Sequence, residues 1–370
     1  MIGIKINIHG GIMEAGINVS GYTNHITQLC KALIKSKVDL GIESSIHPSL
    51  MQYIEPKIID AIKKPYNDEI TVSITRPESW AVKISDRPKK FYGYLVFEGS
   101  KIPYTWKVIL EKYKYVIDGI IVPSEHVLNS ILNAYGNKEQ YHDIPIYIVP
   151  EGVNTKLFKP IKRPKNKLFE FLFMGGWAKG ENDRKGLDIA LKAFTQEFDA
   201  SEPVVFSAKV NISYAPKEKI INDLKNLGIN TDAKNIRFGF DTVPEEVQAK
   251  LYQNADAFVM PTKAEGFGLT IAEAMACGLP TIATNYGGHL DFFSDKVGYP
   301  IEIDHMCKAT DSYPIYEDAE WAIPSIESLR KQMRYVYEHQ DEAKAKGKKA
   351  ARLMKKYSWE NSAKKLLSVF

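Results

Sequence analysis

The sequence has few cysteines and no long apolar run. Its three cysteines, Cys30, Cys277 and Cys307, stand far apart, which excludes both a disulfide framework and a zinc site built on Cys-x-x-Cys spacing. No apolar run approaches the ~18 residues that span a membrane, and the first residues lack the basic and apolar regions of a signal peptide. These absences predict a cytoplasmic protein, either free or attached peripherally to the inner surface of a membrane.

A strong excess of charge of one sign is also lacking. Lysine and arginine number 49 and the acidic residues 45, so the formal net charge is +4. This mild excess suits an anionic small ligand or a membrane surface, whereas nucleic acid usually meets a dense basic stripe. The strongest basic cluster, residues 87–90, is short and favours a solvated loop. We therefore expect no nucleic-acid partner.

The chain is long enough for two domains, with 370 residues of which 44% are hydrophobic. Short apolar runs alternate with amphipathic segments, which predicts an α/β fold with parallel sheets flanked by helices. A basic, proline-containing stretch at residues 159–166 is the best linker candidate. We expect an N-terminal domain at 1–163, a C-terminal domain at 164–356, and a terminal helix at 357–370 that returns to the first domain.

The expected strands are residues 4–8, 72–75, 92–97, 120–122, 146–149, 169–174, 204–208, 236–238, 258–260 and 280–283. The expected helices include residues 22–36, 186–194, 216–227 and 244–254, each with apolar positions at helical spacing. Ligands of doubly wound sheets bind beyond the carboxyl ends of the strands, so the functional residues should lie in loops that follow strands.

The most informative stretch follows the strand that ends at Met260. A loop holds Glu265 and Gly268, and a helix then begins near Leu269 and stops at Gly278. The glycine permits close approach of a ligand to the backbone, and the unpaired N–H groups at the helix start, with the helix dipole, form an anion site.

Two carboxylates, Glu265 and Glu273, flank this anion site. A carboxylate beside a phosphate site is unfavourable unless it binds something, and sugar hydroxyls are natural partners because a carboxylate accepts hydrogen bonds. A nucleotide diphosphate sugar has a sugar at each end of a diphosphate and would satisfy both. The alternative is that both glutamates are surface charges near a helix start, where the dipole favours them.

With its surrounding residues, the Glu265-x7-Glu273 spacing resembles the signature of retaining glycosyltransferases of family 4. Further similar segments lie at residues 121–126, 149–160, 184–194 and 357–359. The resemblance implies the GT-B fold, in which two Rossmann-like, doubly wound domains face an interdomain cleft.

The resemblance also implies roles for individual residues. Glu265 would contact the donor hexose, Glu273 the ribose, and Lys185 and Arg184 the diphosphate, although a solvated pair is the alternative for these two cations. The donor-binding set that it implies is Gly21, Glu273, Phe267, Gly268, Leu269, Thr270 and Phe240. Phe240 would border the base, with a place in the core as the alternative.

The first half of the chain matches the family less closely. Gly21 resembles the family's glycine loop, with Gly10 and Gly11 as competitors, and His25 faces the same region. The arginine that often follows the first strand of the second domain is absent, and Trp177 and Lys179 stand there instead. The family's histidine near the fourth strand is also absent, and Glu98 in that stretch faces the cleft or has a structural role.

The predicted function is transfer of a hexose from a UDP- or GDP-linked donor, of the UDP-glucose or GDP-mannose type, with retention of configuration. The acceptor would be a hydroxyl on a carbohydrate, a lipid-linked or a protein-linked molecule. No Asp-x-Asp pair occurs, so we expect no metal, and no cofactor. The alternatives are a nucleotide-sugar epimerase and a catalytically silent nucleotide-sugar-binding partner. The chain is expected to be a monomer or a homodimer.

Overall fold

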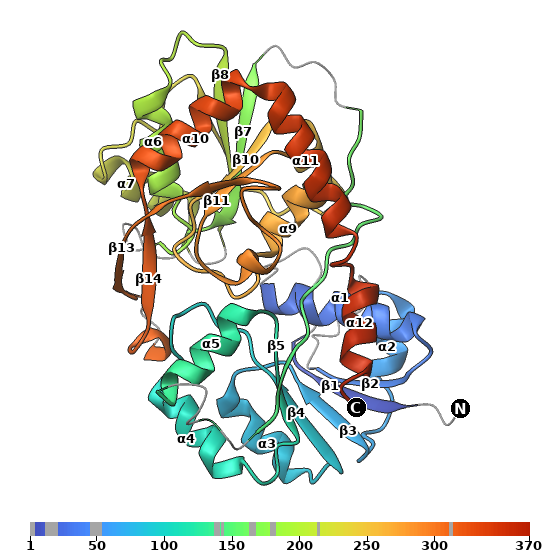
Figure 1. The fold of residues 1–370 in the computed structure, drawn as a ribbon. Coiled ribbons are helices and arrows are strands. Elements are labelled where there is room, and N and C mark those ends of the chain that lie inside the picture. The colour runs from blue at the N-terminus through green and yellow to red at the C-terminus, as the bar shows by residue number, and fades with distance from the viewer. Residues whose placement is uncertain are drawn as a thin grey trace. The chain divides into compact units, whose positions relative to one another are not determined.

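A computed structural model describes most of the chain in two compact units. The described residues are 4–11, 21–44, 54–136, 141, 144–162, 168–177, 183–212, 215–310 and 314–370. Unit 1 comprises Met1–Gly152, Ile315–Ala319 and Tyr357–Phe370, and unit 2 comprises Val153–Pro314 and Glu320–Lys356. Both units alternate strands and helices (Figure 1), as the sequence pattern predicts.

Unit 1 contains a six-stranded sheet in its described residues, in the order β2-β1-β3-β4-β5-β6, with every pairing parallel. Because β1 pairs with both β2 and β3, the strand order reverses there, and the carboxyl edge between β1 and β3 is the topological switch point. The strands are β1 (Lys5–His9), β2 (Asp39–Glu43), β3 (Ile70–Ser73), β4 (Lys90–Tyr94), β5 (Gly119–Val122) and β6 (Ile146–Ile148). The helices are α1 (Gly21–Lys35), α2 (Pro56–Ile62), α3 (Trp80–Ser85), α4 (Tyr104–Tyr113), α5 (Glu125–Ala134) and α12 (Trp359–Leu367).

Unit 2 contains a second parallel six-stranded sheet in its described residues, ordered β12-β11-β10-β7-β8-β9. Its switch point lies between β7 and β10, which pair directly. The strands are β7 (Phe169–Gly176), β8 (Val204–Asn211), β9 (Ile236–Gly239), β10 (Ala257–Met260), β11 (Thr281–Thr284) and β12 (Tyr299–Ile301), and an antiparallel pair is formed by β13 (Ile303–Lys308) and β14 (Glu320–Pro324). The helices are α6 (Leu187–Glu197), α7 (Lys217–Asn226), α8 (Glu245–Asn254), α9 (Leu269–Ala276), α10 (Ile326–Glu338) and α11 (Gln340–Met354).

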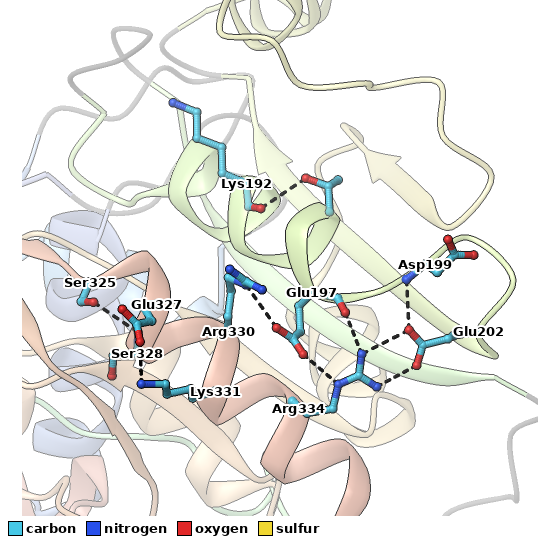
Figure 2. Close-up of polar contacts among 11 residues, drawn as sticks. Lys192, Glu197, Asp199, Glu202, Ser325, Glu327, Ser328, Arg330, Lys331 and Arg334 are labelled. Atoms are coloured by element: carbon cyan, nitrogen blue, oxygen red, sulfur yellow. Dashed lines mark hydrogen bonds and ion pairs between the residues drawn. The ribbon is translucent and has the colours of Figure 1, made fainter.

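Helices α6 and α10 of unit 2 are joined by a polar network (Figure 2). The Arg334 guanidinium donates to carboxylate oxygens of Glu197 at 2.8 Å and of Glu202 at 2.7 Å, and Arg330 donates to Glu197 at 3.1 Å. A surface hollow of about 510 Å³ beside it is lined by Gln196, Glu197, Ile326, Glu327, Arg330 and Lys331. The cations that line this hollow, Arg330 and Lys331, are paired with carboxylates. The hollow is therefore a feature of the junction between the two helices and not a binding site for an anion.

The boundary between the units falls at Gly152–Val153 rather than at the expected 163–164. The segment after Val153 packs on unit 2, because the Phe158 ring lies 6.0 Å from that of Tyr252. Gln253 Nε2 also donates to the carbonyls of Leu157 and Lys159, at 3.2 and 3.0 Å. These contacts attach the residues before the expected linker to the second unit.

Helix α12 belongs to unit 1, where it packs against α1 (Figure 1). Its N-cap Ser358 accepts from the Asn361 N–H at 3.2 Å, and Ser362 Oγ donates to the Pro150 carbonyl. Trp359 is 4% exposed, with its backbone directly against Gly152. A Cβ at position 152 would collide with that backbone, which requires glycine there.

Four strands were not expected. β2 is missed because its buried residues are few and lie between acidic ends, so no clear alternation stands out. β12 is only three residues long. β13 is mostly exposed, and its sequence Ile-Asp-His-Met-Cys-Lys shows no regular alternation of apolar and polar residues. Without a recognisable first strand, the sequence does not indicate that β14 forms the second strand of a pair. No helix in the described residues has both the length and the apolar character needed to cross a membrane.

Candidate functional site

The loop between β10 and α9 carries Glu265. All four residues of β10 are apolar and buried, and the loop residues 261–268 are buried as well. Gly268 is the N-cap of α9 and has a left-handed φ of +94°. A Cβ at Gly268 would lie 3.0 Å from the Cβ of His289. Both the backbone conformation and the close packing therefore require glycine at the start of this helix.

Glu265 is a buried carboxylate in contact with two cations. Lys185 Nζ donates to its Oε1 at 2.6 Å, Arg184 Nη1 lies 3.4 Å from its Oε2, and Thr262 Oγ1 donates to Oε1 at 3.0 Å. Burial alone would raise the pKa of Glu265, but the charges of Lys185 and Arg184 outweigh it and lower the pKa to about 2. Glu265 is therefore ionised at neutral pH, and the structure brings together the three residues predicted to be catalytic.

The turn that carries the two cations docks on the loop after β10. The Lys263 N–H donates to the Arg184 carbonyl at 2.8 Å. Gly186, which directly precedes α6, has a left-handed φ of +73°, and a Cβ there would collide with the Pro261 carbonyl. The loops after β7 and β10 thus meet at the switch point of the unit 2 sheet, where ligands of such sheets bind.

The N-terminus of α9 lies at the edge of this buried loop. Its first internal hydrogen bond runs from the Ala272 N–H to the Gly268 carbonyl at 3.0 Å. The N–H groups of Leu269, Thr270 and Ile271 therefore have no acceptor within the helix. Leu269 and Thr270 are half-exposed, while the preceding residues are buried. This end of the helix can accept an anion.

Glu273 lies one turn into α9 and is 5% exposed. Its Oε2 accepts hydrogen bonds from Gln248 Nε2 at 2.8 Å and from Tyr252 Oη at 3.0 Å, both on α8. Burial raises the pKa of Glu273 to about 8, although these hydrogen bonds oppose the shift. The two glutamates of the motif therefore differ at neutral pH: Glu265 is ionised and Glu273 is protonated.

His289 belongs to the same loop cluster and was missed at the sequence level. Its Nε2 lies 2.6 Å from the Thr284 carbonyl, and since a carbonyl only accepts, Nε2 carries the proton. Its Nδ1 is buried with no hydrogen-bond partner among the described residues, and burial lowers the pKa of His289. A single histidine in a Gly-Gly-His turn has no spacing pattern, so only the tertiary packing reveals it.

The segment that contains His289 supports the Glu265 backbone. The Gly288 N–H donates to the Glu265 carbonyl at 2.7 Å. Gly287 has a left-handed φ of +115°, and a Cβ there would lie 2.9 Å from the Glu265 nitrogen. The loop after β11 thus supports the backbone of the Glu265 loop.

Two aromatic residues of the predicted donor-binding set behave differently. Phe267 is 2% exposed, and its ring centroid lies 5.1 Å from that of Phe292. Its side chain is part of the core, so only its backbone can face a ligand. Phe240 is half-buried and stacks on Phe238 with centroids 5.9 Å apart and an interplanar angle of 10°. Its partial exposure leaves it available to a ligand.

The predicted glycine of unit 1 and its competitors are not equivalent. A Cβ at Gly10 would lie 2.6 Å from Ile26 Cδ1. Among the described residues, one at Gly21 would meet no atom within 4 Å, and one at Gly11 only Thr23 at 3.7 Å. Packing against the described residues of unit 1 therefore explains Gly10 but neither Gly21 nor Gly11. Residues 12–20 lie outside the described part of the chain.

The other candidates have partners inside their own units. His25 is buried, with its Nδ1 at 3.0 Å from Glu151 Oε1 and its ring beside that of Trp359. Glu98 Oε2 accepts from Tyr316 Oη at 2.6 Å.

The position of the missing arginine is occupied in part by a core residue. Trp177 is fully buried and donates from Nε1 to Asp223 Oδ2 at 3.0 Å. Trp177 therefore supports the end of β7 and does not provide a charge. Lys179, the other candidate to replace the arginine, lies outside the described residues.

Comparison with solved structures identifies the fold class. The sucrose-phosphate synthase of Thermosynechococcus elongatus aligns over 99% of this chain and 98% of its own, with a TM-score of 0.70 and 17% identity. Alr3699/HepE of Anabaena, solved in complex with UDP-glucose, aligns over 99% of this chain and 100% of its own, with a TM-score of 0.68 and 12% identity. The chain thus has the GT-B fold of glycosyltransferases, with two Rossmann-like domains.

Comparison of sequences identifies the family. The matching family model, described as family 4 glycosyltransferase in conflict systems, covers residues 129–366. Since this is more than half of the chain, the protein belongs to that family. The sucrose synthase of Acidithiobacillus caldus is 35% identical over 130 residues, which are 35% of this chain and 14% of that protein. The chain therefore matches only a small part of this relative's length.

Proposed function

We propose that the protein is a retaining hexosyltransferase that uses a UDP- or GDP-linked sugar and a hydroxyl acceptor, without a metal ion. The observation that carries this proposal is the buried Glu265 carboxylate in contact with Lys185 and Arg184, beside the free N-terminus of α9. Family membership and the UDP-glucose held by the Anabaena neighbour support this donor class. Unit 2 would bind the donor and unit 1 the acceptor.

The leaving group would be stabilised by groups that are already in place. As the bond between the anomeric carbon and the diphosphate oxygen breaks, negative charge grows on the diphosphate. Lys185, Arg184 and the N–H groups of Leu269 and Thr270 supply positive charge without reorganisation. Helix N-termini bind phosphate through such unpaired N–H groups. Gly268 has no side chain, so the ligand can approach these groups closely.

The reaction would need no side-chain nucleophile. In a front-face substitution, the acceptor oxygen bonds to the anomeric carbon on the side that the phosphate leaves, and its proton passes to a phosphate oxygen. Glu265 would accept hydrogen bonds from hexose hydroxyls and oppose the positive charge that develops on the sugar ring. Its low pKa keeps it ionised for this role.

Glu273 would bind the ribose hydroxyls, with Phe240 beside the base. Hydroxyls that donate to the carboxylate stabilise its ionised form, so nucleotide binding should lower the pKa of Glu273 from about 8. Binding at pH 7 would then release a proton. Calorimetric titration with UDP or GDP, in buffers of different ionisation enthalpy, measures this release.

The decisive experiment compares the wild type with Glu265→Gln on a panel of UDP- and GDP-sugars. Release of nucleoside diphosphate is followed, and the anomeric configuration of the product is determined by NMR. We expect Glu265→Gln to lower turnover by about 100-fold or more, with an unchanged circular dichroism spectrum. Glu338→Gln, at an exposed position on α10, is the matched control and should retain full turnover.

Each alternative outcome has a distinct meaning. Near-normal turnover in Glu265→Gln would remove the central assignment. A free epimerised nucleotide sugar would identify an epimerase, and nucleotide binding without any turnover would identify a silent binding partner. Lys185→Ala should weaken nucleoside diphosphate binding by about tenfold, the equivalent of one charge-assisted hydrogen bond, and unchanged affinity would place the phosphate site elsewhere.

A further inference from the structure

The positive charge of the chain is concentrated in one segment. Residues 343–356 contain seven lysines and arginines and no acidic residue, whereas the whole chain has a net charge of +4. The remainder of the chain therefore carries a net charge of −3. The basic cluster at residues 87–90, expected from the sequence to be the strongest, is smaller, with three cations. The excess charge of the protein is thus a local property of the last part of unit 2.

Nearly all of this segment lies on helix α11 (Figure 1). Lys344, Lys348, Arg352 and Lys355 are exposed and recur every three or four residues, which places them on one face of the helix. At a rise of 1.5 Å per residue this stripe is about 17 Å long. Two further exposed cations lie beside it, Lys349 and Lys356.

The opposite face of α11 packs on unit 2. Its buried residues are Ala343, Gly347, Ala350 and Met354. Gly347 lies against the Gly278 carbonyl at the end of α9, and a Cβ there would collide with it. Because small residues hold the helix down closely, its orientation is fixed and the cationic face points outward.

Carboxylates do not neutralise the central part of this face. Among the described residues no ion pair involves Lys344, Lys348 or Arg352, in contrast to Lys346, which turns inward to Glu342 at 4.0 Å and to the Tyr299 ring at 4.1 Å. Closely spaced like charges repel one another, which is a cost that an anionic partner removes.

The composition of the face distinguishes between anionic partners. Proteins that bind nucleic acid position phosphates with Ser, Thr, Asn and Gln as well as with cations, and they stack bases on aromatic rings. Residues 343–356 contain none of these residue types. A straight helix that presents only cations suits a fluid, planar array of phosphates, and clusters of four to eight Lys or Arg on a helix are typical of binding to anionic lipid.

We propose that the outer face of α11, formed by Lys344, Lys348, Lys349, Arg352, Lys355 and Lys356, is a docking surface for an anionic lipid bilayer. None of these residues belongs to the Glu265 cluster. The proposal therefore goes beyond glycosyl transfer and can be tested without it. Attachment is electrostatic, so it depends on the anionic lipid content of the bilayer and weakens with salt.

The experiment measures co-sedimentation of the full chain with vesicles. The wild type should bind vesicles of mixed phosphatidylglycerol and phosphatidylcholine, should not bind pure phosphatidylcholine vesicles, and should dissociate as salt is added. Each cation near an anionic bilayer contributes about fivefold in affinity. The triple variant Lys344→Gln, Lys348→Gln, Arg352→Gln should therefore bind about 100-fold more weakly.

The matched control carries the same change in net charge at another surface of unit 2. It replaces the exposed Lys234, Arg237 and Lys250 by glutamine and should bind almost as tightly as the wild type. Equal losses in the two triple variants would overturn the proposal, because they would show a response to net charge alone. Absence of wild-type binding to the anionic vesicles would also overturn it. Tighter α11-dependent binding to duplex DNA than to vesicles, at equal salt, would assign the surface to nucleic acid instead.

Discussion

The raised pKa of Glu273 predicts an unusual dependence of stability on pH. The group has an ordinary pKa of 4.5 and a pKa of about 8 in the folded protein. Below pH 4.5 the carboxyl is protonated in both the folded and the unfolded state, and its contribution to stability is complete. As the pH rises toward 8, the unfolded state loses this proton and the folded state keeps it. The free energy of unfolding should therefore fall by about 1.4 kcal/mol per pH unit from this group.

The variant Glu273→Gln isolates this contribution. Glutamine retains an oxygen that can accept from Gln248 Nε2 and Tyr252 Oη but has no proton to lose. Relative to the wild type, the variant should gain about 3 kcal/mol of stability between pH 4.5 and pH 7. The gain should level off above pH 8, where the folded wild type has also lost its proton.

The measurement is differential scanning calorimetry of both proteins without ligand at pH 5, 6, 7 and 8. Glu246→Gln is the control, since Glu246 is an exposed carboxyl on the same helix as Gln248 and Tyr252. It should follow the pH dependence of the wild type. If the difference between Glu273→Gln and the wild type were constant across this range, Glu273 would be ionised in the folded protein and the reasoning from its burial would be refuted.

Three further substitutions test the packing around the site and at α6–α10. Gly186→Ala places a Cβ against the Pro261 carbonyl at a left-handed φ, which should displace the turn that carries Lys185. Nucleoside diphosphate affinity, measured by calorimetric titration, should fall by about tenfold. Unchanged affinity would mean that this turn does not position Lys185. His289→Phe removes the donor to the Thr284 carbonyl and should lower the free energy of unfolding by about 1–3 kcal/mol in urea titration, and a neutral result would show that the buried imidazole does not support the loop. Arg334→Met removes the cation that pairs with Glu202 and leaves Glu197 with Arg330 alone (Figure 2). It should cost about 2–3 kcal/mol, with a smaller loss in high salt, and equal stability at low salt would contradict the bridging role.

The strand, loop and helix around Glu265 could be predicted because each signal is local. β10 is a continuous apolar run, Gly268 marks the helix start, and Gly278 ends the helix with a left-handed φ of +70°. The family resemblance assigns Lys185 and Glu265 to one donor site, and parallel strands bring their following loops to one edge of the sheet, where the structure places both residues. This part of the site follows from local sequence signals together with the family pattern.

Other features depend on contacts between distant segments. Glu265 and Glu273 are both buried, but the pKa of Glu265 is lowered by two cations, whereas Glu273 meets two neutral donors and the charge of Glu245. Spacing along the chain does not reveal this difference. The cationic stripe of α11 is visible in the composition, but it becomes a surface only when small residues on the opposite face orient the helix. The unit boundary differs from the expected one because Phe158, which precedes the expected linker, packs on Tyr252 of unit 2.

Unit 1 is assembled from three separate stretches of chain, Met1–Gly152, Ile315–Ala319 and Tyr357–Phe370. The ribosome synthesises the first stretch well before the third. Helix α1 therefore lacks its partner α12 until the end of the chain has been made. Trp359, Ala363 and Leu366 of α12 are buried in the folded unit. The surface of unit 1 that they cover is therefore exposed to solvent on the nascent chain until α12 has been made. Unit 2 therefore has the opportunity to fold first, although most of unit 1 precedes it in the sequence. Completion of the amino-terminal half is thus a late event in the biogenesis of this protein, and chaperone dependence should be greatest during that interval.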